Sequence, residues 1–131
     1  MPEPARSPFQ YALLRVVPDL ERGECLNAGV VLFARTREFL EARVALDEAR
    51  LAALWPAADA AALRRQLEGL VRIASGDPDA GPIALLPQPQ RFHWLVAPAS
   101  TMVQPSAVHT GLCEDPRATL EHLFGRLVGA G

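Results

Sequence analysis

The chain of 131 residues contains no lysine, and all 13 of its basic residues are arginines. This absence excludes a lysine Schiff base and the lysine of a phosphate-binding loop. The arginines and the 15 acidic residues are spread along the chain and give a net charge of -2. Without a strongly basic region to collect phosphates, binding to nucleic acid is disfavoured.

Cysteine is also scarce, since only Cys25 and Cys113 occur and no Cys-x-x-Cys pair is present. This favours two buried or half-buried thiols over a disulfide framework or a structural zinc site. His109 and Cys113 have a zinc-like spacing, but Gly111 predicts a turn between them and no second ligand pair follows. Glycine-rich phosphate loops and a Gly-x-Ser-x-Gly motif are missing too, so we expect no metal, no cofactor and no recognisable catalytic set.

No apolar run is long enough to cross a bilayer, and residues 1–8 lack the charged and apolar parts of a secretory signal. We therefore expect a cytoplasmic protein without membrane contact, with residues 1–8 as a flexible N-terminal segment. Half of the residues are hydrophobic and 21% are charged, which is typical of a globular protein. At this length, residues 1–131 are predicted to form a single domain.

Strand patterns dominate the first third of the chain. Residues 9–17 are rich in aromatic and β-branched types, residues 28–35 are almost wholly apolar, and residues 38–46 alternate between apolar and polar. Further along, residues 91–97 predict another strand, and residues 102–108 predict a short edge strand interrupted by a proline.

Three helices are expected from their capping residues. Asp47 begins a short helix, Asp59 begins a longer one that ends at Gly76, and Asp115 followed by Pro116 begins the last. Together these elements predict an α+β fold. We expect an antiparallel or mixed sheet of four to five strands, with about three helices packed mainly on one face.

Polar residues gather between the first two predicted strands. Strand alternation places Arg15 among apolar neighbours, so its guanidinium group needs hydrogen-bond acceptors. In a structural interpretation, a carboxylate of Asp19, Glu21 or Glu24 clamps Arg15 and braces the connection. In a functional interpretation, Arg15 and Arg22 flank a turn and form a two-pronged site for a phosphate or carboxylate group.

Asn27 and Gly29 open the second predicted strand. They favour an Asx-type turn with a bulge or a close backbone approach, and the alternative is an Asn27 amide that binds a ligand. Asp19 and Glu24 have the chemistry of an acid–base pair or of hard-metal ligands. A solvated or salt-bridged loop is the favoured interpretation of these two carboxylates.

The run Tyr-x-x-x-Arg-x-Val-Pro-Asp, continued by Arg-Gly-Glu-x-x-Asn-x-Gly-Val-Val-Leu, resembles the opening of DUF3037, a bacterial domain family of unknown function. Val-Gln-Pro-Ser at 103–106 and the Asp-Pro that leads into Leu-x-x-Leu-Phe resemble its C-terminal part, so the resemblance spans nearly the whole chain. It implies an accessory or regulatory partner of HipA-like kinases, beside whose genes members of the family occur. The matched polar positions are the candidate site residues: Arg15, Asp19, Arg22, Glu24, Asn27, Gly29 and Gln104.

These observations support two hypotheses. The first is a non-catalytic interaction module whose polar turn, residues 18–27, contacts a protein partner such as a HipA-like kinase, together with the loop 104–106. The second is a small ligand-binding protein or enzyme that acts on an anionic metabolite or nucleotide at Arg15 and Arg22. The sequence leaves open whether the sheet edge near 102–108 pairs with a second copy in a homodimer.

Overall fold

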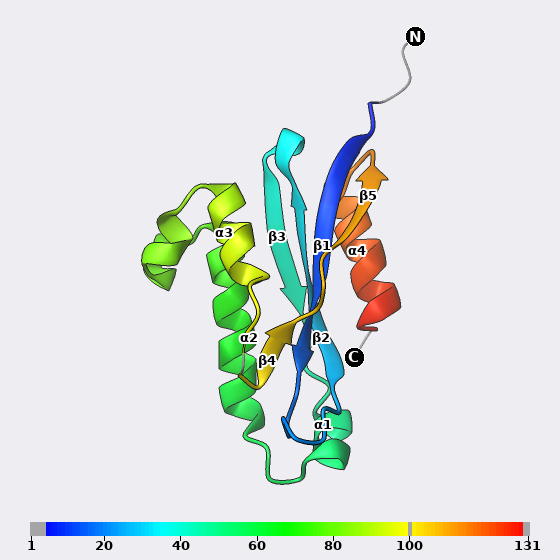
Figure 1. Cartoon of the computed structure of the whole chain (residues 1–131), viewed down its shortest axis with the longest axis vertical. Helices are drawn as coiled ribbons and strands as arrows, with labels where there is room; N and C mark the ends of the chain where they lie inside the picture. The colour runs from blue at the N-terminus through cyan, green and yellow to red at the C-terminus, as the bar shows by residue number, and fades with distance from the viewer. Residues whose placement is uncertain (1–4, 100, 130–131) are drawn as a thin grey trace.

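The computed structural model describes residues 5–99 and 101–129, and these residues form a five-stranded sheet and four α-helices (Figure 1). All paired strands run antiparallel. The strands are β1 (Ser7–Val16), β2 (Leu26–Ala34), β3 (Phe39–Val44), β4 (Val103–Pro105) and β5 (His109–Cys113). The α+β fold predicted from the sequence is therefore confirmed, and the sheet is of the antiparallel kind.

Strand β1 lies in the middle of the sheet. One of its edges pairs with β2, which pairs in turn with β3. Its other edge is shared by two short strands, because β5 pairs with residues 7–11 and β4 with residues 14–16. The first three strands lie where the sequence predicted them. However, β1 already includes Ser7 and Pro8, which fall in the segment expected to be flexible, and residues 1–4 lie outside the described part.

The helices are α1 (Glu48–Leu54), α2 (Ala60–Ser75), α3 (Gln88–Leu95) and α4 (Pro116–Leu127). The side chains of Asp47, Asp59 and Asp115 accept hydrogen bonds from first-turn N–H groups, as expected of N-caps. At the other end of α2, Gly76 adopts the left-handed conformation, with φ of 77°. None of the helices in the described residues has both the length and the hydropathy needed to span a membrane.

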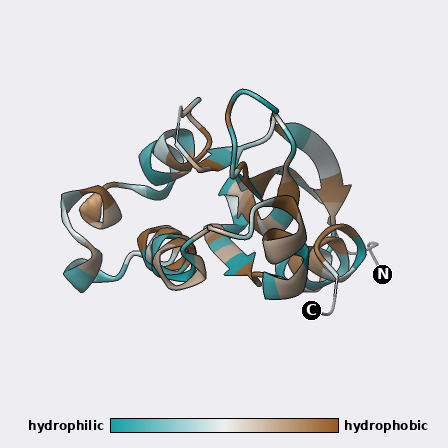
Figure 2. Ribbon diagram, turned by 90° about the horizontal axis from the view of Figure 1, so that it is seen from below, coloured by the Kyte–Doolittle hydropathy of each residue, from teal (hydrophilic) through white to brown (hydrophobic). Residues whose placement is uncertain are grey.

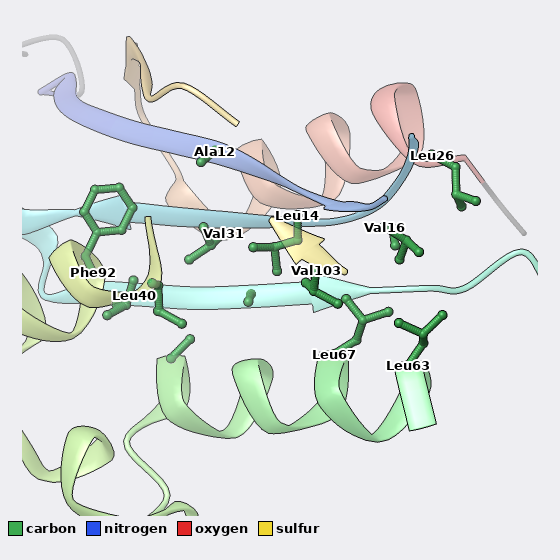
Figure 3. Packing of buried hydrophobic residues seen from close by; sticks show 14 of the residues in the cluster. Ala12, Leu14, Val16, Leu26, Val31, Leu40, Leu63, Leu67, Phe92 and Val103 are labelled. Carbon is green, nitrogen blue, oxygen red and sulfur yellow. The ribbon is translucent and has the colours of Figure 1, made fainter. Parts of the chain in front are cut away.

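Helices α1, α2 and α3 cover one face of the sheet. Leu51, Leu67 and Phe92, one from each helix, belong to the same buried cluster as Leu14 of β1. Figure 3 shows Leu67 pointing from α2 towards the strands. This is the larger part of the core, so the helices lie mainly on one face, as expected.

Helix α4 covers the opposite face. Leu120 and Phe124 are buried in a second cluster with Leu13 of β1 and Val30 of β2. Leu13 and Leu14 therefore serve different layers, because successive side chains of a strand point to opposite faces. Figure 2 shows hydrophobic segments on both strands and helices, and the two helical layers bury the apolar side chains of the sheet.

The prediction of a strand over residues 91–97 is wrong, because this region forms α3. Phe92 and Leu95 are buried, whereas the two residues between them are exposed. This spacing of three belongs to a helix that packs one side on the sheet. The aromatic and β-branched residues that suggested a strand are compatible with a helix once tertiary packing decides.

The sequence also missed β5. The predicted edge strand 102–108 contributes only β4, and Gly111, expected in a turn, lies inside β5. The ring of Phe9 covers Gly111, where a Cβ atom would lie 2.7 Å from Phe9 Cζ. The two thiols differ from the prediction as well, because Cys113 is buried but Cys25 is exposed.

Candidate functional site

The β1–β2 turn, residues 17–25, contains three of the seven candidate site residues, Asp19, Arg22 and Glu24. Asp19 Oδ1 accepts hydrogen bonds from the N–H groups of Glu21 (3.0 Å) and Arg22 (3.4 Å). The Asp19 carbonyl accepts a third, from the N–H of Gly23 (3.0 Å), which adopts a φ of 71°. An aspartate that folds back on its own turn and a glycine in the left-handed region give this segment a defined shape.

The turn displays its side chains to solvent, and residues 20–25 are all exposed. Arg22 Nε donates to Glu24 Oε1, so these two charges are paired with each other. Such an exposed pair contributes little to stability. Leu20, in the same exposed segment, is 54% exposed and was not among the site residues predicted from the sequence. The sequence feature that could have identified Leu20 is its position as a single leucine in an otherwise polar segment.

A polar row, made of Asn27, Arg15 and Gln104, crosses the base of this turn. Arg15 lies opposite Asn27 on β2 and opposite Gln104 on β4. Side chains at directly opposed positions share a face and lie about 5 Å apart at Cβ. Three predicted site residues from distant parts of the sequence are therefore brought together, on the face covered by α4.

Each member of the polar row has different partners. Asn27 Nδ2 donates to the carbonyl of Leu127 at the end of α4 (3.0 Å), and Gln104 Nε2 donates to the carbonyl of Thr101 (2.9 Å). Arg15 Nε is buried and has no hydrogen-bond partner among the described residues. The row thus ties the sheet to α4 and leaves one buried cationic donor.

The structure does not support the expected clamp on Arg15. Within residues 5–99 and 101–129 no ion pair joins Arg15 to Asp19, Glu21 or Glu24, because Asp19 shapes the turn and Glu24 pairs with Arg22. Among the described residues Asn27 Oδ1 accepts no hydrogen bond of the Asx-turn type, and its Nδ2 group donates to α4.

Gly29 has the close backbone approach that the sequence predicted. The register between β1 and β2 shifts between Leu14 and Arg15, so one residue of β2 is extra and the ladder contains a bulge. A Cβ atom on Gly29 would lie 2.8 Å from Val44 Cγ1 and 2.9 Å from the Arg43 carbonyl oxygen. Gly29 therefore has a packing role beneath the polar row.

No group of three or more metal-ligating side chains occurs in the part of the chain that the structure describes. A hollow of about 310 Å³ with a mostly apolar lining lies between α2, α3 and β4. Its lining includes Trp94 and Leu70 but neither Arg15 nor Arg22. A two-pronged anion site at these arginines stays a prediction from the sequence.

Replacing Asn27 with Asp should lower the free energy of unfolding by about 1–3 kcal/mol, because the half-buried hydrogen bond to α4 is lost and a negative charge faces carbonyl groups. Urea denaturation followed by circular dichroism measures this. Gln104→Glu removes a comparable but exposed hydrogen bond and should change stability by less than about 0.5 kcal/mol. Equal urea midpoints for the two variants would contradict a stabilising hydrogen bond between Asn27 and α4.

A protein-family model described as "Protein of unknown function (DUF3037)" matches residues 11–128. The matched region contains the β1–β2 turn and the whole polar row. No curated protein and no solved structure matches the chain.

Proposed function

Because the chain belongs to the DUF3037 family, whose description assigns no activity, we propose its function from the geometry of the candidate site and take only the partner from the family resemblance. We propose a non-catalytic, cytoplasmic interaction module that presents the β1–β2 turn to a protein partner. The observation that carries this proposal is a turn held in shape by Asp19 while residues 20–25 are exposed.

The chemistry of the turn suits a protein surface. Leu20 offers an exposed apolar side chain for burial, and the Arg22–Glu24 ion pair lies two to four positions further along the same turn. Protein interfaces concentrate their binding energy in a few such anchors enclosed by a polar rim. A turn that is already ordered loses less conformational entropy on binding than a flexible loop.

The family resemblance of residues 11–32 supplies the candidate partner, a HipA-like kinase. The two strands that flank the turn are the most extensively paired in the sheet, so they give it a rigid base. Binding residues are often placed on loops that such a scaffold positions. In this proposal the chain regulates or escorts the kinase without performing chemistry itself.

One observation favours the alternative, a ligand-binding protein or enzyme for an anionic metabolite or nucleotide. Arg15 Nε is buried with no partner among the described residues, and Asn27 and Gln104 occupy the positions opposite Arg15 on the two neighbouring strands. A guanidinium group with unused donors is suited to a phosphate or carboxylate. Binding of inorganic phosphate or ATP to the purified chain, abolished by Arg15→Ala, would favour this alternative over the interaction module.

The test is affinity purification of the tagged chain from its own cells. We expect a kinase-like protein to copurify with the wild type and to be reduced at least about tenfold with Leu20→Ala/Arg22→Ala, since truncating interface anchors costs about 2 kcal/mol or more. Both positions are exposed, so circular dichroism should show a folded variant.

The matched control is Leu85→Ala/Arg65→Ala, which makes the same changes at exposed positions outside the turn. This control should recover as much partner as the wild type. Equal recovery with the turn variant, or no copurifying protein with the wild type, would contradict the proposal.

A further inference from the structure

The outer edge of β5 has main-chain groups that the sheet does not use. The N–H of Ser106 donates to the carbonyl of Leu13 (2.8 Å), and the N–H of Val17 donates to the carbonyl of Met102 (2.6 Å). Odd-numbered residues of β1 therefore turn their main-chain groups towards β4 and β5. The pairing partners of β1 residues 7, 9 and 11 are Cys113, Gly111 and His109 of β5.

It follows from the alternation of an antiparallel ladder that these odd-numbered residues of β5 bond to β1. The even-numbered residues, Thr110 and Leu112, direct their N–H and C=O groups away from β1. Pro8 agrees with this assignment, because it has no N–H and lies opposite Leu112 in what must be a non-hydrogen-bonded pair. Among the described residues no strand pairs with this outer edge.

The same edge lacks the features that usually prevent strand pairing. Residues 92–113 contain no Asp, Glu, Lys or Arg, although 21% of the chain is charged. Natural edge strands are protected by charged side chains, prolines or bulges, and β5 has none of them. Leu112 is 63% exposed on this strand, so an apolar side chain stands beside the unused main-chain groups.

We propose that β5 pairs antiparallel with β5 of a second copy of this chain and so joins two sheets into one. The register is centred on Gly111, which faces Gly111 of the second copy. Thr110 of each copy then forms a hydrogen-bonded pair with Leu112 of the other, and all the outward main-chain groups of these two residues are satisfied.

This register is sterically and electrostatically self-complementary. The central pair is of the close, non-hydrogen-bonded type, with Cα atoms about 4.5 Å apart, and glycine leaves room for that approach. The only charged residue near the pairing, Glu114, comes opposite Val108 and meets no like charge. Such twofold symmetry favours a second copy over an unrelated peptide, because one strand supplies both sides.

Self-association through β5 goes beyond the proposed function and leaves its surface free. Strand β5 pairs with residues 7–11, at the opposite end of β1 from the β1–β2 turn (Figure 1). A dimer would therefore present two turns. The dimer and partner binding are therefore tested with different variants, in β5 and in the β1–β2 turn, and either can be lost without the other.

Light scattering coupled to size exclusion tests the proposal on the full chain. We expect the wild type to have twice the monomer mass of 14.2 kDa at high concentration. Leu112→Arg should shift it to monomer, because it replaces the apolar side chain at the joined edge and places two like charges at diagonal positions on one face of the paired strands. Thr110→Pro should do the same, since it removes an outward N–H and leaves the pairing with β1 intact.

Leu85→Arg is the matched control, because it makes the same change at an exposed leucine outside β5 and should stay dimeric. A wild type that is monomeric up to about 1 mM would overturn the proposal, since even weak interfaces associate at that concentration. A dimer that survives both edge variants, or one that Leu85→Arg also dissociates, would overturn it as well. Circular dichroism confirms that each variant is folded.

Discussion

Replacing Gly29 with alanine is expected to lower the free energy of unfolding by about 2–3 kcal/mol, the upper part of the range for an overpacked core. The added Cβ would lie 2.8 Å from Val44 Cγ1 and 2.9 Å from the Arg43 carbonyl oxygen. The oxygen belongs to the backbone of β3, so it can move away only by distorting the pairing of β2 with β3. Urea denaturation at equilibrium measures the change.

The matched control is Gly69→Ala, the same chemical change in α2. Apart from the neighbouring residues and backbone of its own helix, no atom lies within 4 Å of a Cβ built there, and alanine is favoured over glycine inside a helix by about 1 kcal/mol. We therefore expect Gly29→Ala to lower the free energy of unfolding and Gly69→Ala to raise it. If Gly29→Ala unfolds at the same urea concentration as the wild type, β2 does not pack against β3 as closely as described at Gly29.

Replacing Leu67 with alanine is expected to have the largest effect of all, a loss of about 3–5 kcal/mol. Leu67 is 1% exposed, and it anchors α2 in the buried cluster that contains Leu14 and Val103 (Figure 3). Truncation removes apolar contacts and leaves a cavity that the paired strands cannot collapse to fill. Thermal and urea unfolding followed by circular dichroism measure the loss.

Leu85→Ala is the control for this change, because Leu85 is exposed and its truncation should alter stability by less than about 0.5 kcal/mol. A domain of this size is stable by only about 5–15 kcal/mol, so Leu67→Ala should unfold at a much lower urea concentration. A loss below about 1 kcal/mol would show that α2 does not hold the core as described.

Local signals explain why so much of the fold could be predicted. Asp47, Asp59 and Asp115 mark helix starts because their side chains satisfy first-turn N–H groups, an interaction within three residues. The first strands were recognisable because their apolar patterns reflect burial on both faces or on one. Where the stabilising contact is local, or the pattern is long, sequence is sufficient.

The two errors of secondary structure arise from contacts between distant residues. Phe92 packs against Phe33 of β2, with ring centroids 5.1 Å apart, and this contact favours a helix in a segment with strand propensity. Pro89, in the first turn of α3, was the neglected local sign of a helix start. Gly111 looked like a turn residue because its real partner, the ring of Phe9, lies about a hundred positions away.

The candidate site shows the same division. The turn was visible because Asp19 and Gly23 are neighbours in sequence, but the polar row depends on β4 pairing with β1, which no local pattern encodes. Gln104 was therefore nominated only through the family resemblance. Leu20 was missed because exposure of a leucine is a property of the folded surface rather than of residue type.

Partner binding by the β1–β2 turn is measured most directly with a photo-activated crosslinking residue at position 20, on the exposed turn, in growing cells. The same residue at position 85, which is also exposed but lies outside the turn, serves as the control. We expect a covalent adduct from position 20 alone, with a kinase-like protein identified by mass spectrometry. No adduct at position 20, or the same adduct from both positions, would contradict the assignment of the β1–β2 turn as a partner-binding surface.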